Sequence, residues 1–236
     1  ICFGERVILV ALGIDAKGDK HVLALREGHS ENATLVRALI ADLVERGLDP
    51  ETARLWVIDG AKALRRAIAE HFGNSALVQR CQIHKLRNVL GHLPDEMQAS
   101  VRRAMNDAWH TENPALALKQ LQRLAGSLAR EHPGAASSLR EGLEETLTLR
   151  RLGIDGALYR TLRTTNAIEN LNGSVAHYTR NVRRWRDGQM LVRWIGAALL
   201  EARRGFRRLR GYRDIPKLRA ALASATRTPK TELKVA

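Results

Sequence analysis

The spacing of the apolar residues changes along this chain of 236 residues, and the change limits the folds that it can adopt. Over the first part, short apolar runs alternate with turn signals and with segments of helical spacing. Four of these runs are predicted strands: residues 5–14, 21–26, 54–58 and 76–80. Asp15 and Gly18 supply a tight hairpin turn between the first two. Strands that alternate with helices predict an α/β fold with a sheet of mixed pairing.

The later part of the chain has helical spacing. Apolar residues recur every three or four positions through residues 94–150, which predicts an all-helical insertion whose stripes form a core. After a predicted loop at 151–163, a helix starts near Thr164 or Thr165, and either hydroxyl can cap it. A longer helix begins at Asp187.

The predicted organisation has four parts. They are an α/β part at 1–93, the helical insertion at 94–150, a part at 151–212 that completes the core with two helices, and a basic C-terminal tail at 213–236. Residues 224–236 lack apolar periodicity, so we expect them to be loose.

The charge of the chain favours a polyanionic partner. Lys and Arg number 39 against 25 Asp and Glu, which gives a formal net charge of +14. Between Arg150 and Arg213 there are fifteen Arg, no Lys and four acidic residues. Phosphate contacts release counterions, and the planar guanidinium pairs with phosphates and base edges. We therefore predict nucleic-acid binding; the alternatives are a solvated basic surface and a genome that prefers Arg codons.

Some classes of protein are excluded. No apolar run is long enough to cross a bilayer and no signal-peptide pattern opens the chain, so no membrane partner is expected. The two cysteines, Cys2 and Cys81, give no disulfide framework. The expected location is a bacterial cytoplasm. Because Ile1 lies directly in a strand-like run, we expect the chain to be a fragment.

Asp59 and Glu169 are the candidate catalytic carboxylates. Asp59 ends an apolar strand and precedes Gly60, at the position where α/β sheets place ligands; the alternative is an N-cap of the next helix. Glu169 shares a polar helical strip with Asn166 and Asn172, and the alternative is a solvated helix face. Two such carboxylates that meet at the edge of a sheet can hold Mg²⁺.

Cys81 and His84 have the spacing of metal ligands. Zinc needs four ligands, however, and no second pair lies nearby in the sequence. The alternative is a strand-to-helix junction that presents His84, Lys85, Arg87 and Asn88 to a phosphate backbone. Trp185 also has two interpretations, stacking on an unpaired base or anchoring the following helix in the core.

Three motifs resemble those of a known family. They are WVIDGAKAL with Asp59, QRCQIHKLRN with Cys81 and His84, and RTTNAIENLN with Glu169. In this order and spacing they resemble the Mutator-like bacterial insertion-sequence transposases of the DDE superfamily. The combination is specific, whereas no single motif is. The similarity extends from Ile1 to about Tyr212.

The resemblance implies an RNase H-like fold, with the helical insertion between the last sheet strand and the helix that carries the catalytic Glu. It makes Asp59 the second and Glu169 the third member of an Asp-Asp-Glu triad that holds two Mg²⁺ ions, for which Mn²⁺ can substitute. Cys81 and His84 become the Cys-x-x-His motif of the family, with a role in DNA handling or in support of the active site. The implied partners are double-stranded DNA, as element ends and target, and further copies of the chain.

One departure from the family pattern concerns the first aspartate. By the resemblance it would fall about two residues before Ile1, on an opening strand that is missing here, and Asp15 does not replace it because it maps to the hairpin. The expected function is therefore a transposase catalytic fragment for DNA cleavage and strand transfer that is inactive alone. The alternatives are a non-catalytic DNA-binding remnant and an RNase H-like nuclease.

Candidate DNA-contacting residues come from the second and third motifs and from the Arg-rich region. They are Arg80, Lys85, Arg87, Asn88, Arg163, Asn166, Asn172, Arg180, Arg183, Arg184 and Arg186.

Overall fold

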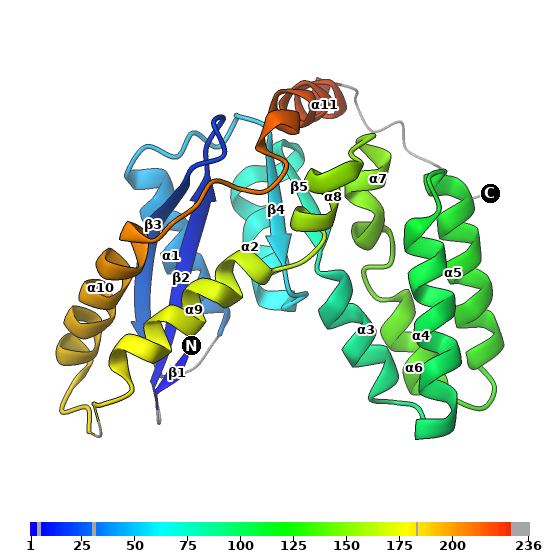
Figure 1. The fold of residues 1–236 in the computed structure, drawn as a ribbon, viewed down its shortest axis with the longest axis horizontal. Coiled ribbons are helices and arrows are strands. Elements are labelled where there is room, and N and C mark those ends of the chain that lie inside the picture. Colours follow the sequence, from blue (N-terminus) through cyan, green and yellow to red (C-terminus); the bar gives the residue numbers. More distant parts are fainter. Residues whose placement is uncertain (4–5, 30–31, 183, 228–236) are drawn as a thin grey trace.

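The computed structural model describes residues 1–3, 6–29, 32–182 and 184–227 (Figure 1). The strands are β1 (Cys2–Phe3), β2 (Arg6–Ile14), β3 (Lys20–Gly28), β4 (Arg54–Ile58) and β5 (Ala76–Arg80). The α-helices are α1 (Ala33–Glu45), α2 (Lys62–Phe72), α3 (Gln82–Leu90), α4 (Asp95–His110), α5 (Pro114–Leu128), α6 (Pro133–Arg140), α7 (Thr148–Arg151), α8 (Gly156–Leu162), α9 (Asn166–Thr179), α10 (Gly188–Arg204) and α11 (Ile215–Arg227). Three short 3₁₀ segments are η1 (Gly73–Ser75), η2 (Glu144–Leu147) and η3 (Tyr212–Asp214).

The first sheet is antiparallel, in the order β1-β2-β3. Asp15 closes its hairpin because its Oδ1 accepts hydrogen bonds from the backbone N–H groups of Lys17 and Asp19, at 2.8 and 2.9 Å. This confirms the predicted turn. Alternate residues of β2 face opposite ways: Ile8 packs towards α9 and α10, whereas Leu9 packs towards α1 and α2. Helices therefore cover both faces, which explains why β2 is apolar throughout.

The second sheet pairs β4 with β5 in parallel, with Ile58 opposite Arg80. Its two faces are also covered, because Trp56 and Ile58 pack with α1 and α2 while Leu55 and Val57 pack with α8 and α11. Within the described ranges the two sheets share no backbone ladder. The mixed α/β class is confirmed, but the strands form two sheets and not the expected single one. Among the described residues, the edge of β2 opposite β3 pairs with Cys2 and Phe3 of β1 and, at Ile8, with Ile1.

Helices α4, α5 and α6 lie within residues 94–150, the segment predicted to be helical, and pack around a core of leucine, alanine and Trp109. This helical segment is called the insertion below. A buried polar network joins it to β5. Gln79 and Gln82 each donate an amide hydrogen bond to the carbonyl of Thr146, at 3.0 and 2.9 Å. The Trp109 Nε1 donates to the Thr146 hydroxyl at 3.1 Å. Because every member of such a network must stay paired, it fixes the insertion to the strand.

Two expectations for the C-terminal half were wrong. The predicted loop at 151–163 contains the helix α8, whose Leu158 and Tyr159 are buried. The predicted basic tail at 213–236 contains α11, which buries Leu218 and Leu222 in the same cluster and includes residues 224–227 of the segment expected to be loose. Packing against the outer face of β4 and β5 stabilises both helices; residues 228–236 lie outside the described residues.

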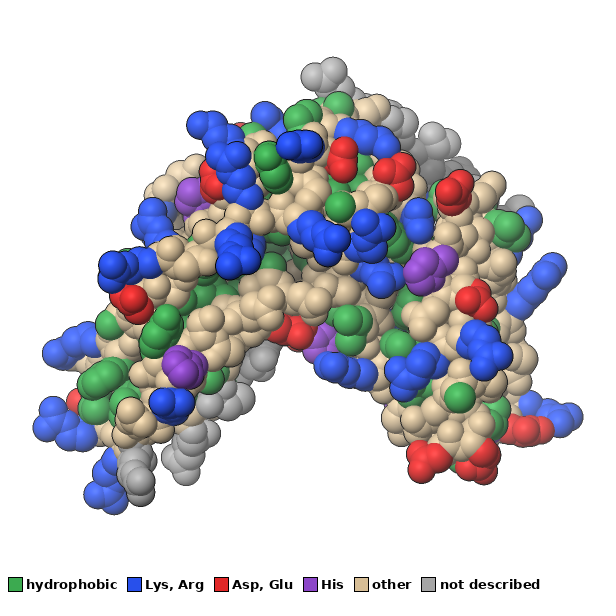
Figure 2. Space-filling view, in the orientation of Figure 1, with side chains coloured by type: hydrophobic (Ala, Val, Ile, Leu, Met, Phe, Trp, Pro, Cys, Tyr) green, Lys and Arg blue, Asp and Glu red, His purple; other side chains and the backbone are tan. Residues whose placement is uncertain are grey.

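The overall shape is a crescent with two arms (Figure 1). One arm holds β1–β3, α9 and α10, and the other holds α4–α6, with β4, β5, α8 and α11 at the crown. The space-filling view shows a hollow between the arms, with Lys and Arg side chains along its margin (Figure 2). No helix among the described residues is long and apolar enough to span a membrane.

Candidate metal-binding site at the ends of the parallel strands

Asp59 directly follows β4, and its carboxylate is exposed. Its Oδ1 accepts a hydrogen bond from the backbone N–H of Ala61 at 3.0 Å, which forms an Asx turn. The N-cap residue of α2 is Ala61, so the alternative that Asp59 caps this helix is wrong. Within the described part of the chain, Asp59 Oδ2 makes no hydrogen bond or ion pair, so this oxygen is available to a ligand.

Cys81 lies beside Asp59, because β4 and β5 are parallel and end in register. The backbone N–H of Cys81 donates to the Ile58 carbonyl at 2.7 Å, which continues the ladder by one step. The residue that follows each strand is thus at the same edge of the sheet. His84 lies one turn further along α3 and is half-buried.

Glu169 reaches this edge from α9. The backbone N–H of Gln82 donates to the Arg163 carbonyl at 2.9 Å and holds the start of α9 near the start of α3. At the N-cap of α9, the Thr165 side chain makes no capping bond, so the expected cap is wrong. Its hydroxyl instead hydrogen-bonds to Glu169 Oε1.

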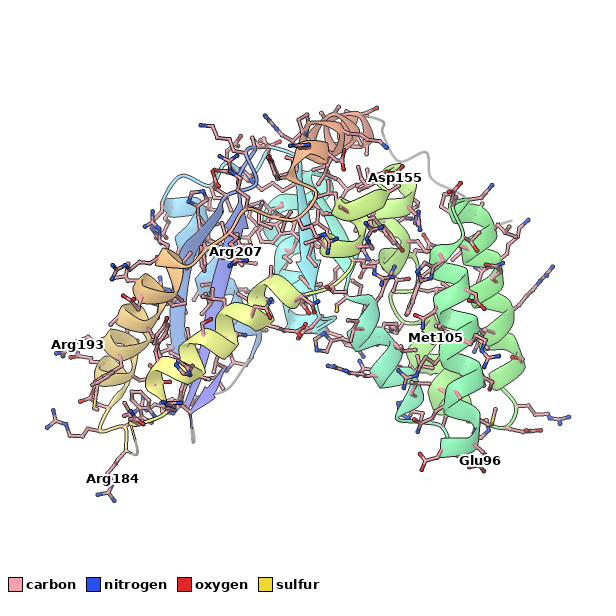
Figure 3. The ribbon with its side chains drawn as sticks, in the orientation of Figure 1. Glu96, Met105, Asp155, Arg184, Arg193 and Arg207 are labelled. Carbon is pink, nitrogen blue, oxygen red and sulfur yellow. The ribbon has the colours of Figure 1, made fainter. Side chains whose placement is uncertain are left out.

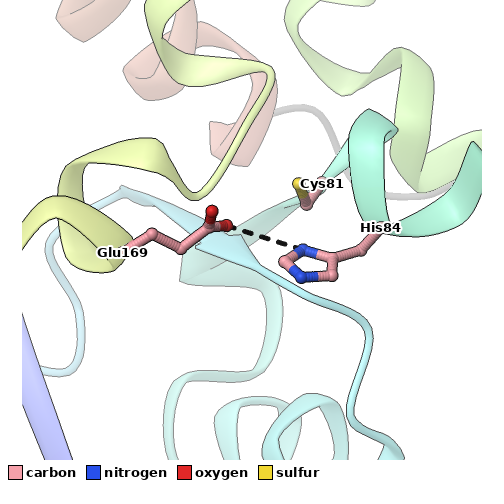
Figure 4. A group of neighbouring side chains, drawn as sticks. All are labelled: Cys81, His84 and Glu169. Atoms are coloured by element: carbon pink, nitrogen blue, oxygen red, sulfur yellow. Dashed lines mark ion pairs between the residues drawn. The ribbon is translucent and has the colours of Figure 1, made fainter. Parts of the chain in front are cut away.

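Figure 4 shows three candidate metal ligands, Cys81, His84 and Glu169. Thr165 connects them. Its Oγ1 is 3.3 Å from Cys81 Sγ and 3.2 Å from His84 Nδ1, in addition to the bond with Glu169. His84 Nδ1 lies 3.8 Å from Glu169 Oε1. The ligand atoms of Cys81, His84 and Glu169 all lie within 4.8 Å of one another. In Figure 1, the ends of β4 and β5 and the starts of α3 and α9 meet at the top of the space between the arms.

The structure thus brings Cys81, His84 and Glu169 together, and among the described residues Asp59 lies outside this group of ligand atoms. Asp59 adjoins Cys81 through the strand register, and Glu169 adjoins Cys81 through Thr165. Asp59 and Glu169 are both exposed carboxylates, the ligand type that suits Mg²⁺ and Mn²⁺. Cys81 and His84 offer softer donors.

Arg80 corrects a sequence expectation. It was a candidate phosphate contact, but its side chain is only 6% exposed. Its guanidinium donates to the carbonyls of Glu141 and Gly60, at 2.9 and 3.2 Å, and pairs with the Glu141 carboxylate at 3.2 Å. Gly60 has φ +111°, and a Cβ there would lie 2.3 Å from Arg80 Nε. Arg80 therefore joins the turn after Asp59 to the end of the insertion.

Lys85 also corrects an expectation, because it is fully buried and cannot face a phosphate backbone in this structure. Its Nζ donates to the carbonyls of Ser138 and Glu141. Burial, with a smaller effect from the Arg80 charge, lowers the pKa of Lys85 to about 8. Burial tends to raise the pKa of Glu141, but the charges of Arg80 and Lys85 outweigh it and lower that pKa.

The other candidate DNA contacts divide by exposure. The exposed ones are Arg87, Asn88, Asn166, Arg180, Arg184 and Arg186. Arg163 is half-buried, with its guanidinium 5.8 Å from the centre of the Tyr159 ring. Asn172 is half-buried, and its Oδ1 is buried without a described partner. Arg183 lies outside the described residues. Figure 3 shows Arg184 and Arg193 extending away from the α10 arm.

Trp185 packs against the core between β2 and α10. Its ring lies edge-on to the Phe3 ring, with the ring centroids 5.4 Å apart. The core-anchoring interpretation is confirmed.

Sequence reasoning missed Thr165 as the link between ligands and Glu141 as the partner of Arg80. The sequence signal for the burial of Arg80 was a pair of glycines, Gly60 and Gly142. Both adopt positive φ, and at both a Cβ would collide with the Arg80 guanidinium.

We predict that Arg80→Met lowers the free energy of unfolding by about 2–4 kcal/mol, because the Gly60 carbonyl loses its guanidinium donor and the carbonyl and carboxylate of Glu141 each lose a hydrogen bond. Lys62→Met is the matched control: Lys62 contacts the same Glu141 at 3.6 Å, but its side chain is 88% exposed. The control should cost less than about 0.5 kcal/mol. Urea unfolding of both variants measures the difference in the free energy of unfolding. Equal losses of stability would contradict a structural role for the buried contacts of Arg80.

Comparison with known proteins identifies the family. Residues 3–208 match the family described as transposase, Mutator family. The transposase for insertion sequence element IST2 of Acidithiobacillus ferrooxidans is 32% identical over 73% of this chain and 57% of its own length. The transposase for insertion sequence element IS256 in transposon Tn4001 of Staphylococcus aureus is 28% identical over 81% of this chain and 48% of its own.

A third relative is the transposase for insertion sequence element ISRM5 of Rhizobium meliloti (strain 1021), which is 27% identical over 91% of this chain and 53% of its own length. The chain spans about half the length of the curated relatives it matches. The motifs that meet at the edge of β4 and β5 lie within the matched residues. The chain therefore belongs to the Mutator family of transposases.

Proposed function

We propose that this chain is the catalytic part of a DDE-type transposase, in which Asp59 and Glu169 hold Mg²⁺ for DNA cleavage and strand transfer. The observation that carries this proposal is that two exposed carboxylates, from segments 110 positions apart, lie near the end of one parallel strand pair: Asp59 follows β4, and Glu169 is linked through Thr165 to Cys81, which follows β5. Both carboxylates are exposed, and we propose that a duplex binds in the hollow between the arms (Figure 2).

Each side chain at this edge has a defined task in the proposal. Asp59 offers Oδ2, while its Oδ1 is held by the Ala61 N–H. Thr165 orients Glu169 through its hydroxyl. Two bound ions would activate the attacking water or DNA 3′-hydroxyl and stabilise the leaving oxygen. The protein needs no covalent bond to DNA, because its groups position the reactants and supply charge.

We further propose that the two sheets are parts of an RNase H-like sheet. The resemblance places the first aspartate of the triad just before Ile1, on a strand that would extend β1. Such a strand would run along the edge of β2 beyond Ile8. Among the described residues, this part of the edge has no backbone partner. Because Asp59 and Glu169 supply only two of the three carboxylates, we propose that the chain alone does not cleave DNA.

The second candidate function is DNA binding without catalysis. The exposed Arg184 and Arg186 and the net charge of +14 favour it, since neither depends on the triad. Both candidates have double-stranded DNA as partner, and catalysis at two element ends would need at least two copies of the chain.

We predict metal-dependent cleavage only when the third carboxylate is supplied. The test adds a strand that ends in Asp-Gly directly before Ile1 and measures nicking of a duplex with the element's end sequence, in Mg²⁺ or Mn²⁺. Asp59→Asn and Glu169→Gln should each lower the rate at least about 100-fold, because even residues that only support a metal ligand cost 10–100-fold. Asp15→Asn is the control and should leave the rate unchanged, since Asp15 only closes the hairpin.

Two results would count against this assignment. One is cleavage by the extended chain that survives Asp59→Asn, and the other is cleavage by the unextended chain. Absence of cleavage with intact DNA binding would favour the second candidate function.

We also predict that the α10 arm binds the DNA backbone. Replacing Arg184 and Arg186 by Glu should weaken duplex binding and reduce the slope of log K against log salt by about 2, close to one per lost phosphate contact. The matched control replaces Arg123, in α5, and Arg130, just after α5, by Glu, which makes the same change of charge at exposed residues of the insertion. Fluorescence anisotropy at several salt concentrations measures both; equal slopes in the two variants would exclude a specific role for this arm.

A further inference from the structure

We propose that Cys81, His84 and Glu169 form a binding site for a thiophilic divalent cation such as Zn²⁺, distinct in chemistry from a magnesium pair. The first support is their convergence. Three different ligand types come from the start of α3 and from the first turn of α9, and their ligand atoms lie within 4.8 Å of one another (Figure 4).

A tetrahedral ion would draw these ligand atoms closer together. Zinc bonds of about 2.0–2.3 Å to nitrogen, oxygen and sulfur place neighbouring ligand atoms roughly 3.3–3.6 Å apart. The separation of His84 Nδ1 and Glu169 Oε1 is 3.8 Å. The side chains of these two residues are 31% and 43% exposed, so both can adjust and an ion can enter.

The Thr165 hydroxyl marks the centre of the site. It lies 3.3 Å from Cys81 Sγ and 3.2 Å from His84 Nδ1, and it hydrogen-bonds to Glu169 Oε1. One hydroxyl carries one proton, so it can donate to only one of these three atoms. A cation in the place of this hydroxyl would accept lone pairs from all three atoms, with a water as the fourth ligand.

The donor set selects the ion. Thiolate and imidazole favour Zn²⁺ or Co²⁺ over Mg²⁺, which prefers oxygen ligands. On binding, the Cys81 thiol proton goes to solvent, and the neutral His84 ring carries its proton on Nε2. Cys81 is fully buried and its backbone is held by the Ile58 carbonyl, so the sulfur is fixed before an ion arrives.

The site shares Glu169 with the proposed catalytic centre. If the proposed function holds, a zinc ion here competes with Mg²⁺ for this carboxylate. Binding itself does not depend on that function, and it is tested without DNA.

The test is a titration of the 236-residue chain with Co²⁺, which reports thiolate ligation by a charge-transfer band in the near ultraviolet. We expect one equivalent of Co²⁺ to give this band and Zn²⁺ to displace it. Cys81→Ser should abolish the band. Cys2→Ser is the matched control, since Cys2 is the other cysteine of the chain, and it should keep the band.

Further variants separate this site from a magnesium site. His84→Ala and Glu169→Gln should each weaken Co²⁺ binding at least about 10-fold, whereas Asp59→Asn should leave it unchanged. Urea unfolding confirms that each variant is folded, and His84→Ala serves as the decisive variant if Cys81→Ser does not fold. The proposal is overturned if no band forms, if Cys2→Ser removes it, or if neither His84→Ala nor Glu169→Gln weakens binding.

Discussion

The buried guanidinium of Arg80 is the contact on which the arrangement of the site most depends. A buried charge is costly unless it is paired and hydrogen-bonded, so its partners are fixed in place. Those partners are the Gly60 carbonyl, next to Asp59, and the carbonyl and carboxylate of Glu141 at the end of the insertion. Lys85 bonds to the same Glu141 carbonyl from α3. The insertion is therefore tied to the turn that positions a candidate metal ligand.

This arrangement separates two roles of the basic residues near the site. Arg80 and Lys85 are buried and hold the fold together, whereas Arg87, Arg184 and Arg186 are exposed. Asp59 and Glu169 are exposed, and Lys and Arg side chains lie along the margin of the hollow between the arms (Figure 2). Such a distribution lets a polyanion approach a cation-dependent site, because the surrounding positive charge offsets the repulsion from Asp59 and Glu169.

Much of the fold could be predicted from the sequence, because apolar runs and turn residues carry local information. The strands, the Asp15 hairpin and the Asp187 cap, which accepts from the Met190 N–H at 2.6 Å, depend on neighbours in the chain. The burial of Arg80 could not be predicted in this way, since its partners are 20 and 61 positions away. The motifs placed Asp59, Cys81, His84 and Glu169 together, but the connecting role of Thr165 depends on tertiary structure. The helical spacing of Ile215, Leu218 and Leu222 was present in the sequence, and predicting a tail overlooked it.

The central claim is that Asp59 and Glu169 belong to one oxygen-ligand metal centre. A crystal structure of the chain with Mn²⁺, with the ions located by anomalous scattering, tests it most directly. The account predicts an ion bonded to oxygens of both carboxylates at the ends of β4 and β5. Ions bound elsewhere, with neither Asp59 nor Glu169 as a ligand, would contradict it.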